Sequence, residues 1–231
     1  MQALRHTPTS AVMIALALLT AAHLAAQTPT YAVLYSFQVG ADGSGPNGVT
    51  LGKSGALYGT TYTGGKNTCS TQTQYYLCGT VFELAPSTAG AWTKTVLHSF
   101  SGPDGARPSP QIIEDVPGPS LVFGSSGALY GTTEVGGSND PAGTGPAGTV
   151  FELAPPATAG EAWAETVLYS LSGSGEAPHT PNGVLIDPSG AVYTTAVASY
   201  FSKGVGVAGG AVFKLTPPAE PGGTWTESTT G

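Results

Sequence analysis

The sequence predicts an all-β protein built from three copies of one four-stranded antiparallel unit. Three observations lead to this prediction. Short runs rich in Tyr, Thr, Val and Phe recur in a fixed order along the chain. Gly and Pro, with 34 and 19 residues, separate these runs as turns separate strands. Beyond the N-terminal segment, no stretch shows the 3.6-residue periodicity of an amphipathic helix.

The first 26 residues have the features of a secretory signal peptide. Arg5 and His6 precede an apolar stretch, Ala11–Ala22, and small residues follow it up to Ala26. A stretch of about a dozen residues is too short for a membrane span, which needs about 20, but it suits a signal peptide. We therefore expect cleavage after Ala26 and an exported mature chain, residues 27–231, without a membrane span. An uncleaved anchor helix is the alternative.

The charge of the chain excludes several classes of partner. Seven Lys and Arg residues stand against 14 Asp and Glu residues, for a net charge of −7. Because no basic stripe is available to neutralise phosphate groups, neither nucleic acid nor an anionic lipid surface is an expected partner. Charged residues make up only 9% of the chain, while apolar runs recur regularly, which argues against disorder.

Two cysteines, Cys69 and Cys78, are predicted to form a disulfide, because exported proteins reach an oxidising compartment. A zinc site is the competing interpretation. It is disfavoured because only His98 and His179 follow the signal segment, and neither has ligand spacing from the two cysteines. The sequence therefore predicts no metal ligand and no cofactor.

Each copy is expected to contain four strands, called a to d in chain order. In the first copy, alternation in the LYGTT run places Leu57 and Gly59 on one face and Tyr58 on the other. The glycine of this run is expected to allow a close approach of another chain segment. Strand a is Val49–Leu51, Leu121–Phe123 and Val184–Ile186; strand b carries LYGTT, and strand c carries TVFEL. Strand d is the TVLYSF-like run that follows Trp92 and Trp163, and no such run follows Trp225, so the third copy is expected to lack a d strand of its own.

Four-stranded units in series are typical of β-propeller blades. We expect one propeller-like domain over residues 27–231, with units at about 38–100, 101–171 and 172–231, and with strand 31–37 completing the last blade. Propellers usually have four to eight blades, so three would close poorly. Three outcomes follow: the natural chain continues beyond Gly231, two chains complete one ring as a homo-oligomer, or the blades form an open arc.

The recurring motifs GxLYGTTxxGG, GTVFxL, Trp and TVLYSF, followed by a loop with Asp-Gly, resemble the GloVer tandem repeat of exported bacterial proteins. The resemblance covers the mature chain. It implies a bacterial protein of the cell surface or secreted fraction, and it carries over no catalytic residue. The third copy departs from the pattern, because Thr194-Thr195-Ala196 replaces Gly-Thr-Thr and Lys214 replaces the glutamate of strand c.

The long connections between strands b and c, at Thr63–Cys78, Val135–Gly148 and Val197–Gly210, differ among the copies. Variable loops on one face of a rigid scaffold are where binding residues usually lie, so this face is the expected functional one. The candidate ligand-binding residues are Tyr75, Tyr76, Tyr200 and Phe201, whose rings could stack on a ligand, together with Asp42, Asp104 and His179 in the d–a connections.

Signatures of catalysis are missing from the sequence. It contains no GxSxG or HExxH motif and no phosphate-binding loop, and no catalytic residue is predicted. These observations favour an exported, non-catalytic binding or display module for a glycan or a protein. A propeller-based glycoside hydrolase or lyase and a purely structural envelope protein are the alternatives.

Overall fold

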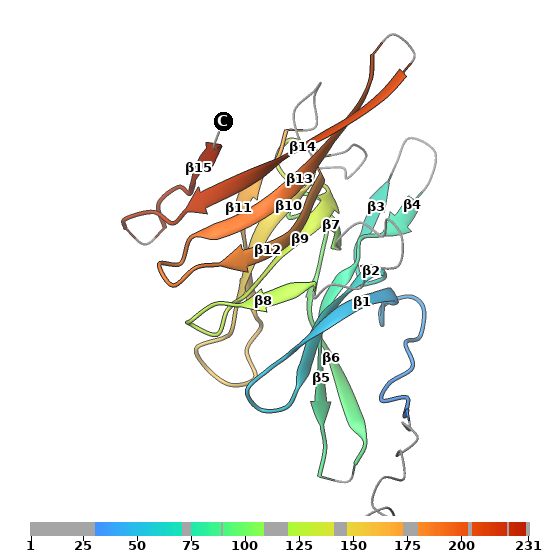
Figure 1. The fold of residues 1–231 in the computed structure, drawn as a ribbon. Coiled ribbons are helices and arrows are strands. Elements are labelled where there is room, and N and C mark those ends of the chain that lie inside the picture. The colour runs from blue at the N-terminus through green and yellow to red at the C-terminus, as the bar shows by residue number, and fades with distance from the viewer. Residues whose placement is uncertain are drawn as a thin grey trace, which may run out of the picture. The chain divides into compact units, whose positions relative to one another are not determined.

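The regular structure in the described part of the chain consists of β-strands, β1 to β15, and contains no helix (Figure 1). The computed structural model describes residues 31–70, 75–88, 90–108, 120–140, 147–172, 180–202, 205–220 and 222–229. The all-β prediction is confirmed, and three antiparallel sheets of four or five strands follow one another along the chain. Within these ranges no helix could cross a membrane.

The first sheet has the strand order β1-β2-β5-β6, so neighbours in sequence are neighbours in the sheet. Its strands are β1 (Ser44–Leu51), β2 (Leu57–Thr63), β5 (Thr80–Pro86) and β6 (Trp92–Ser99). A register shift between Pro46 and Val49 bends β1. Strands a to d therefore lie where the sequence predicts them.

The second sheet repeats this order, but its first strand is divided. Both β7 and β8 pair with β9, and residues 109–119 between them lie outside the described ranges. Strands β7 and β8 thus pair with two parts of β9, where the first sheet has the single strand β1 beside β2. The strands are β7 (Ala106–Pro108), β8 (Leu121–Phe123), β9 (Leu129–Val135), β10 (Thr149–Ala154) and β11 (Ala164–Ser170).

The third sheet has the order β12-β13-β14-β15 and contains its own fourth strand. Its strands are β12 (Thr180–Ile186), β13 (Val192–Ser202), β14 (Val205–Thr216) and β15 (Thr226–Thr229). Strand β15 holds the place expected for residues 31–37, which form no strand.

Residues 226–229 form this fourth strand because their pairing register matches that of β11 in the second sheet. Glu227 pairs with Leu215 as Glu165 pairs with Leu153, so the residues after Trp225 begin a d strand like those after Trp163.

Strands β13 and β14 form a long hairpin where the sequence predicts a loop at Val197–Gly210. Pairing continues without a break from Val197↔Gly210 to Ser202↔Val205. Valine and aromatic residues in this segment favour an extended, paired backbone, which extends the hairpin beyond the repeated core of the sheet.

A small hairpin of β3 (Thr68–Ser70) and β4 (Tyr75–Leu77) lies between β2 and β5. The predicted disulfide between Cys69 and Cys78 is confirmed, and both cysteines are buried. The disulfide therefore joins β3 to the segment between β4 and β5.

The core repeats from sheet to sheet because the last residue of each TVLYSF-like run packs on strand c of the sheet that follows. Phe37 meets Phe82 edge-on with ring centroids 5.0 Å apart, and Phe100 meets Phe151 at 5.2 Å. A Cβ on Gly131 would lie 2.7 Å from Phe151 Cζ, so the glycine of strand b allows the close approach that the sequence predicts.

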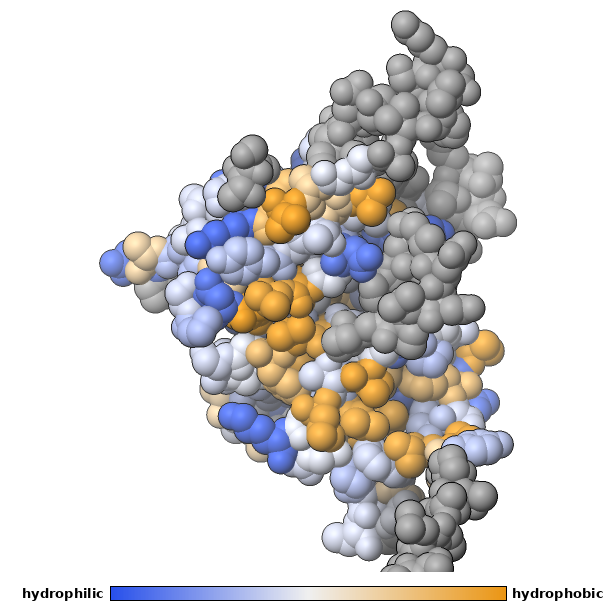
Figure 2. All heavy atoms as spheres, in the orientation of Figure 1, coloured by the Kyte–Doolittle hydropathy of each residue, from blue (hydrophilic) through white to orange (hydrophobic). Residues whose placement is uncertain are grey.

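The first strands of the three sheets lie next to one another, with β8 in contact with both β1 and β12. Ser120 Oγ donates a hydrogen bond to Gly48 O at 2.7 Å, which joins the second sheet to the first. Figure 2 shows apolar side chains gathered over the region where β1, β8 and β12 lie in Figure 1. Exposed apolar residues on these strands and on β14 are Val49, Leu51, Leu185 and Val212.

Candidate functional site

The tyrosine of strand b and the glutamate of strand c form a pair across the first sheet. Tyr58 OH donates a hydrogen bond to Glu83 Oε1 at 2.6 Å, and the two residues face each other in the register of β2 and β5. Burial of the ring, followed by this bond, raises the pKa of Tyr58 above its ordinary value. Glu83 therefore fixes a neutral tyrosine ring at the border with the second sheet.

Two aromatic side chains of the second copy approach this ring. Phe123, the last residue of β8, lies edge-on to Tyr58 with centroids 5.2 Å apart. Trp163, directly before β11, lies tilted at 6.2 Å from the same ring. Trp163 thus contacts the preceding copy, and rings from three strand ends converge at one place.

A cavity of about 510 Å³ lies beside these rings. It is built from the β1–β2 turn, the β8–β9 turn and the β10–β11 connection. We call it the aromatic cleft; its lining residues are Leu51, Gly52, Lys53, Ser54, Tyr58, Phe123, Gly124, Gly127, Pro155 and Trp163.

The chemistry of the aromatic cleft suits binding. Phe123 and Trp163 are half-buried, so part of each ring faces the cavity, while exposed Lys53 adds an ammonium with three N–H donors. Its lining residues, all within the described ranges, include no carboxylate, histidine or thiol for proton transfer or nucleophilic attack. Apolar walls with few polar groups are typical of small-ligand sites.

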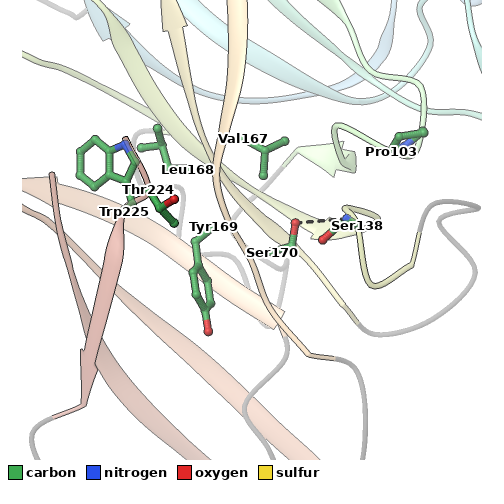
Figure 3. A pocket seen from close by; sticks show the side chains of 8 residues that line it. All are labelled: Pro103, Ser138, Val167, Leu168, Tyr169, Ser170, Thr224 and Trp225. Carbon is green, nitrogen blue, oxygen red and sulfur yellow. Dashed lines mark hydrogen bonds between the residues drawn. The ribbon is translucent and has the colours of Figure 1, made fainter. Parts of the chain in front are cut away.

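A second cavity, of about 390 Å³, lies between β11 and the residues that precede β15 (Figure 3). Trp225 and Leu168 line one end, and Ser138 and Pro103 line the other. The Ser138 amide donates a hydrogen bond to Ser170 Oγ at 3.1 Å. This cavity holds one indole ring and no charged side chain in its lining, so it offers fewer ligand contacts than the aromatic cleft.

The predicted residue Asp42 organises the turn before β1. Its carboxylate accepts hydrogen bonds from the Gln38 amide at 2.5 Å, from Tyr35 OH at 2.9 Å and from Lys94 Nζ at 2.9 Å. Burial alone would raise the pKa of this carboxyl, but these donors together lower it. All three donors belong to the protein, so Asp42 joins the segment before β1 to strand β6.

Asp104 occupies the equivalent turn of the next copy. It accepts hydrogen bonds from the Ser101 amide at 2.7 Å and from Ser101 Oγ at 3.0 Å, and His98 Nε2 lies 2.9 Å from its other oxygen. The His98 bond and the Ser101 bonds lower the pKa of Asp104 against the effect of burial, which by itself raises it. The aspartate of the Asp-Gly turn is thus a structural anchor in both copies.

Tyr76, the predicted aromatic of the disulfide hairpin, lies half-buried against Arg107. The guanidinium carbon is 4.3 Å from the centroid of Tyr76 and 5.5 Å from that of Tyr62, whose OH donates to Glu134 at 2.9 Å. One face of the Tyr76 ring is therefore covered by a cation from within the protein.

The remaining predicted residues stay predictions. Tyr75 and Tyr200 lie in β4 and β13, and Phe201 follows Tyr200, but their side chains are outside what the structure describes. His179 lies outside the described residues altogether.

Sequence reasoning missed the aromatic cleft because it placed function on the long loops, whereas the cleft lies at short turns. Lys53 stands in a minimal turn, and Trp163 occurs at a position repeated in every copy. The detectable signal was the combination of a repeated aromatic residue with a turn residue, Lys53, that the other copies lack.

No protein-family model matches the chain, and no curated protein is similar to it in sequence.

Proposed function

We propose that this protein is an exported, non-catalytic binding module that holds a glycan in the aromatic cleft. One observation carries the proposal: Tyr58, Phe123 and Trp163 converge on a cavity of about 510 Å³. The C–H bonds on the face of a sugar ring are weakly positive and lie favourably against the electron-rich face of an aromatic ring. Lys53 and Ser54 supply donors for sugar hydroxyl groups.

The size of the cleft favours a glycan over a folded protein as the ligand. Small-ligand sites enclose about 300–1,000 Å³, and the cleft falls within this range. A stable protein interface buries about 800 Å² on each partner, far more than ten lining residues provide at a concave site. The ligand is therefore expected to enter as one or two sugar rings.

Export and a bacterial cell-surface or secreted location are part of the same proposal. The signal-like N-terminal segment, the buried disulfide and the resemblance to the GloVer repeat support them. A glycan-binding role is consistent with this location, because surface and extracellular polysaccharides are found there.

We further propose a propeller-like arrangement that two chains complete as a homo-oligomer. The contacts of β8 with β1 and β12 support it, because the innermost strands of propeller blades also lie next to one another. Exposed Val49 and Leu185 on the first strands would be covered by a second copy.

The test is a glycan array followed by isothermal titration of the best ligand. Trp163→Ala is expected to weaken binding about tenfold, the equivalent of about 1.4 kcal/mol, and Lys53→Ala to weaken it less. The matched control is Trp92→Ala, which removes the equivalent indole of the first copy. Trp92 does not line the cleft, so this variant should bind like the parent.

Because Trp163 also packs on Tyr58, the midpoint of urea unfolding is measured for each variant. Lys53 is exposed, so Lys53→Ala keeps the test valid even if Trp163→Ala unfolds. The proposal would be refuted if the protein bound no glycan on the array, or if both cleft variants bound the ligand with unchanged affinity.

A further inference from the structure

Equivalent side chains join each copy to the next, and the first such junction is a complete ion pair. Lys94 Nζ, from β6, lies 2.9 Å from Asp42 Oδ1, and Tyr35 OH donates to the same oxygen. Only 2% of the Lys94 side chain is exposed, and the carboxylate of Asp42 is the partner of its buried charge. The junction therefore balances one buried cation with one anion.

At the second junction the same positions hold His98, Asp104 and Glu165. Glu165 of β11 replaces Lys94, so a carboxylate stands where the first copy has an ammonium. One ligand atom from each of the three side chains lies within 4.8 Å of the other two. Two carboxylates and an imidazole thus meet where the first copy supplies a positive charge.

Glu165 lacks the partner that its equivalent finds at the third junction. There Tyr169 OH donates a hydrogen bond to Glu227. At the second junction the tyrosine is replaced by His98, which bonds Asp104. Glu165 Oε1 is buried and accepts no hydrogen bond within the described part of the chain. An unpaired buried carboxylate oxygen is costly, so this atom requires a cation or a proton.

We propose that His98, Asp104 and Glu165 bind one divalent transition-metal ion, which links the first sheet to the second. One imidazole nitrogen and two carboxylate oxygens are a ligand set that Zn²⁺ accepts, with bonds of about 2.0–2.2 Å. At such bond lengths tetrahedral ligands lie about 3.4 Å apart. To bind the ion, the Glu165 side chain therefore needs only a small movement, which shortens the distance between ligand atoms from at most 4.8 Å to about 3.4 Å.

Charge and ligand type both favour this ion class. Burial of Glu165 Oε1 and the nearby carboxylate of Asp104 both disfavour an anionic Glu165, and a bound cation would offset this penalty. Ca²⁺ and Mg²⁺ prefer oxygen ligands, so the imidazole selects against them. Cys69 and Cys78 are joined in a disulfide and cannot supply a competing thiolate site.

The experiment uses the tag-free protein, stripped of metal with a chelator and titrated with ZnCl₂ by calorimetry. We expect one Zn²⁺ per chain and a rise in the midpoint of thermal unfolding on binding. CaCl₂ should produce neither effect.

The repeat itself supplies matched variants. His98→Tyr introduces the residue that the other copies carry at this position, and Glu165→Lys introduces the residue of the first copy. Each should lose at least about a hundredfold in zinc affinity, since even outer partners of a metal ligand contribute ten- to a hundredfold. Glu165→Lys should also raise the unfolding midpoint of the metal-free protein, because its ammonium can pair with Asp104 as Lys94 pairs with Asp42.

His179→Ala and Glu227→Gln are the controls, and both should retain the parent's affinity. Absence of zinc binding by the parent would overturn the proposal and leave a protonated Glu165 as the explanation of the buried atom. Equal zinc binding by the parent, His98→Tyr and Glu165→Lys would also overturn it, because the ion would then lie elsewhere.

Discussion

Single residues decide how closely the copies can pack and how each junction is joined. Gly59 and Gly131 leave room for Phe82 and Phe151, an outcome that the position of glycine within a strand pattern made predictable. The partner of Glu83 was not predictable in the same way. A glutamate on an apolar strand suits a solvated face equally well, and only the cross-strand register brings it to Tyr58.

Asp42 gives a pH-dependent prediction at this scale. Asp42→Asn removes the charge that accepts bonds from Gln38, Tyr35 and Lys94, and we expect a loss of about 1–2 kcal/mol at pH 7 after allowance for solvent screening. The folded-state pKa of Asp42 is lowered from 3.8, so its contribution is present above that pH and is lost as the pH falls through the folded value.

Urea unfolding at pH 7 and at about pH 3 checks this prediction. The parent and Asp42→Asn should differ at the higher pH and differ less at the lower one, whereas exposed Glu161→Gln should match the parent at both. A difference of equal size at the two pH values would show that the charge of Asp42 is not its source.

At the scale of elements, strands b and c were predictable because the same residues recur in the same order with strong β propensity. The fourth strand of the third sheet was not, because β15 shares only its first residues, Thr226 and Glu227, with the repeated pattern. The β13–β14 extension was missed for the opposite reason. Its glycines suggested a loop, but pairing between two segments that together carry valine, tyrosine and phenylalanine outweighs the preference of glycine for turns.

The disulfide hairpin supplies the prediction at this scale. Cys69→Ser with Cys78→Ser releases a closed loop of about ten residues and should lower the free energy of unfolding by about 2–3 kcal/mol through the entropy of the unfolded chain. The loss should be measurable as a lower urea midpoint.

Without the disulfide, the hairpin is held mainly by contacts such as that of Tyr76 with Arg107. Hydrogen exchange of the backbone amides in β3 and β4 should therefore also become faster in the double variant. Reduction of the parent by dithiothreitol should reproduce both effects. An unchanged urea midpoint in the double variant would contradict the stabilising role of the disulfide.

At the scale of the whole molecule, the sequence predicts three sheets in series but not the location of the cleft. Repetition reports which residues recur; it does not report which turns of neighbouring copies meet. Lys53 and Trp163 are far apart in sequence, and only packing of the second sheet on the first brings them to one cavity. The same is true of His98 and Glu165.

Self-association is the prediction that belongs to this scale. Exposed Val49 and Leu185 should lie in the contact between two copies, so light scattering at micromolar concentration should give twice the mass of one chain. Val49→Asp with Leu185→Asp should give a monomer, while Thr95→Asp, on exposed outer strand β6, should not. A monomeric parent would remove the homo-oligomer.

The fluorescence of Trp163 tests most directly whether ligand binding occurs at the junction of two sheets. In a protein carrying Trp92→Phe and Trp225→Phe, Trp163 is the remaining indole. Titration with the best glycan should shift its emission to shorter wavelength in a saturable way, with the same dissociation constant that calorimetry gives. Saturable binding by calorimetry with an unchanged Trp163 spectrum would place the ligand elsewhere and contradict the account.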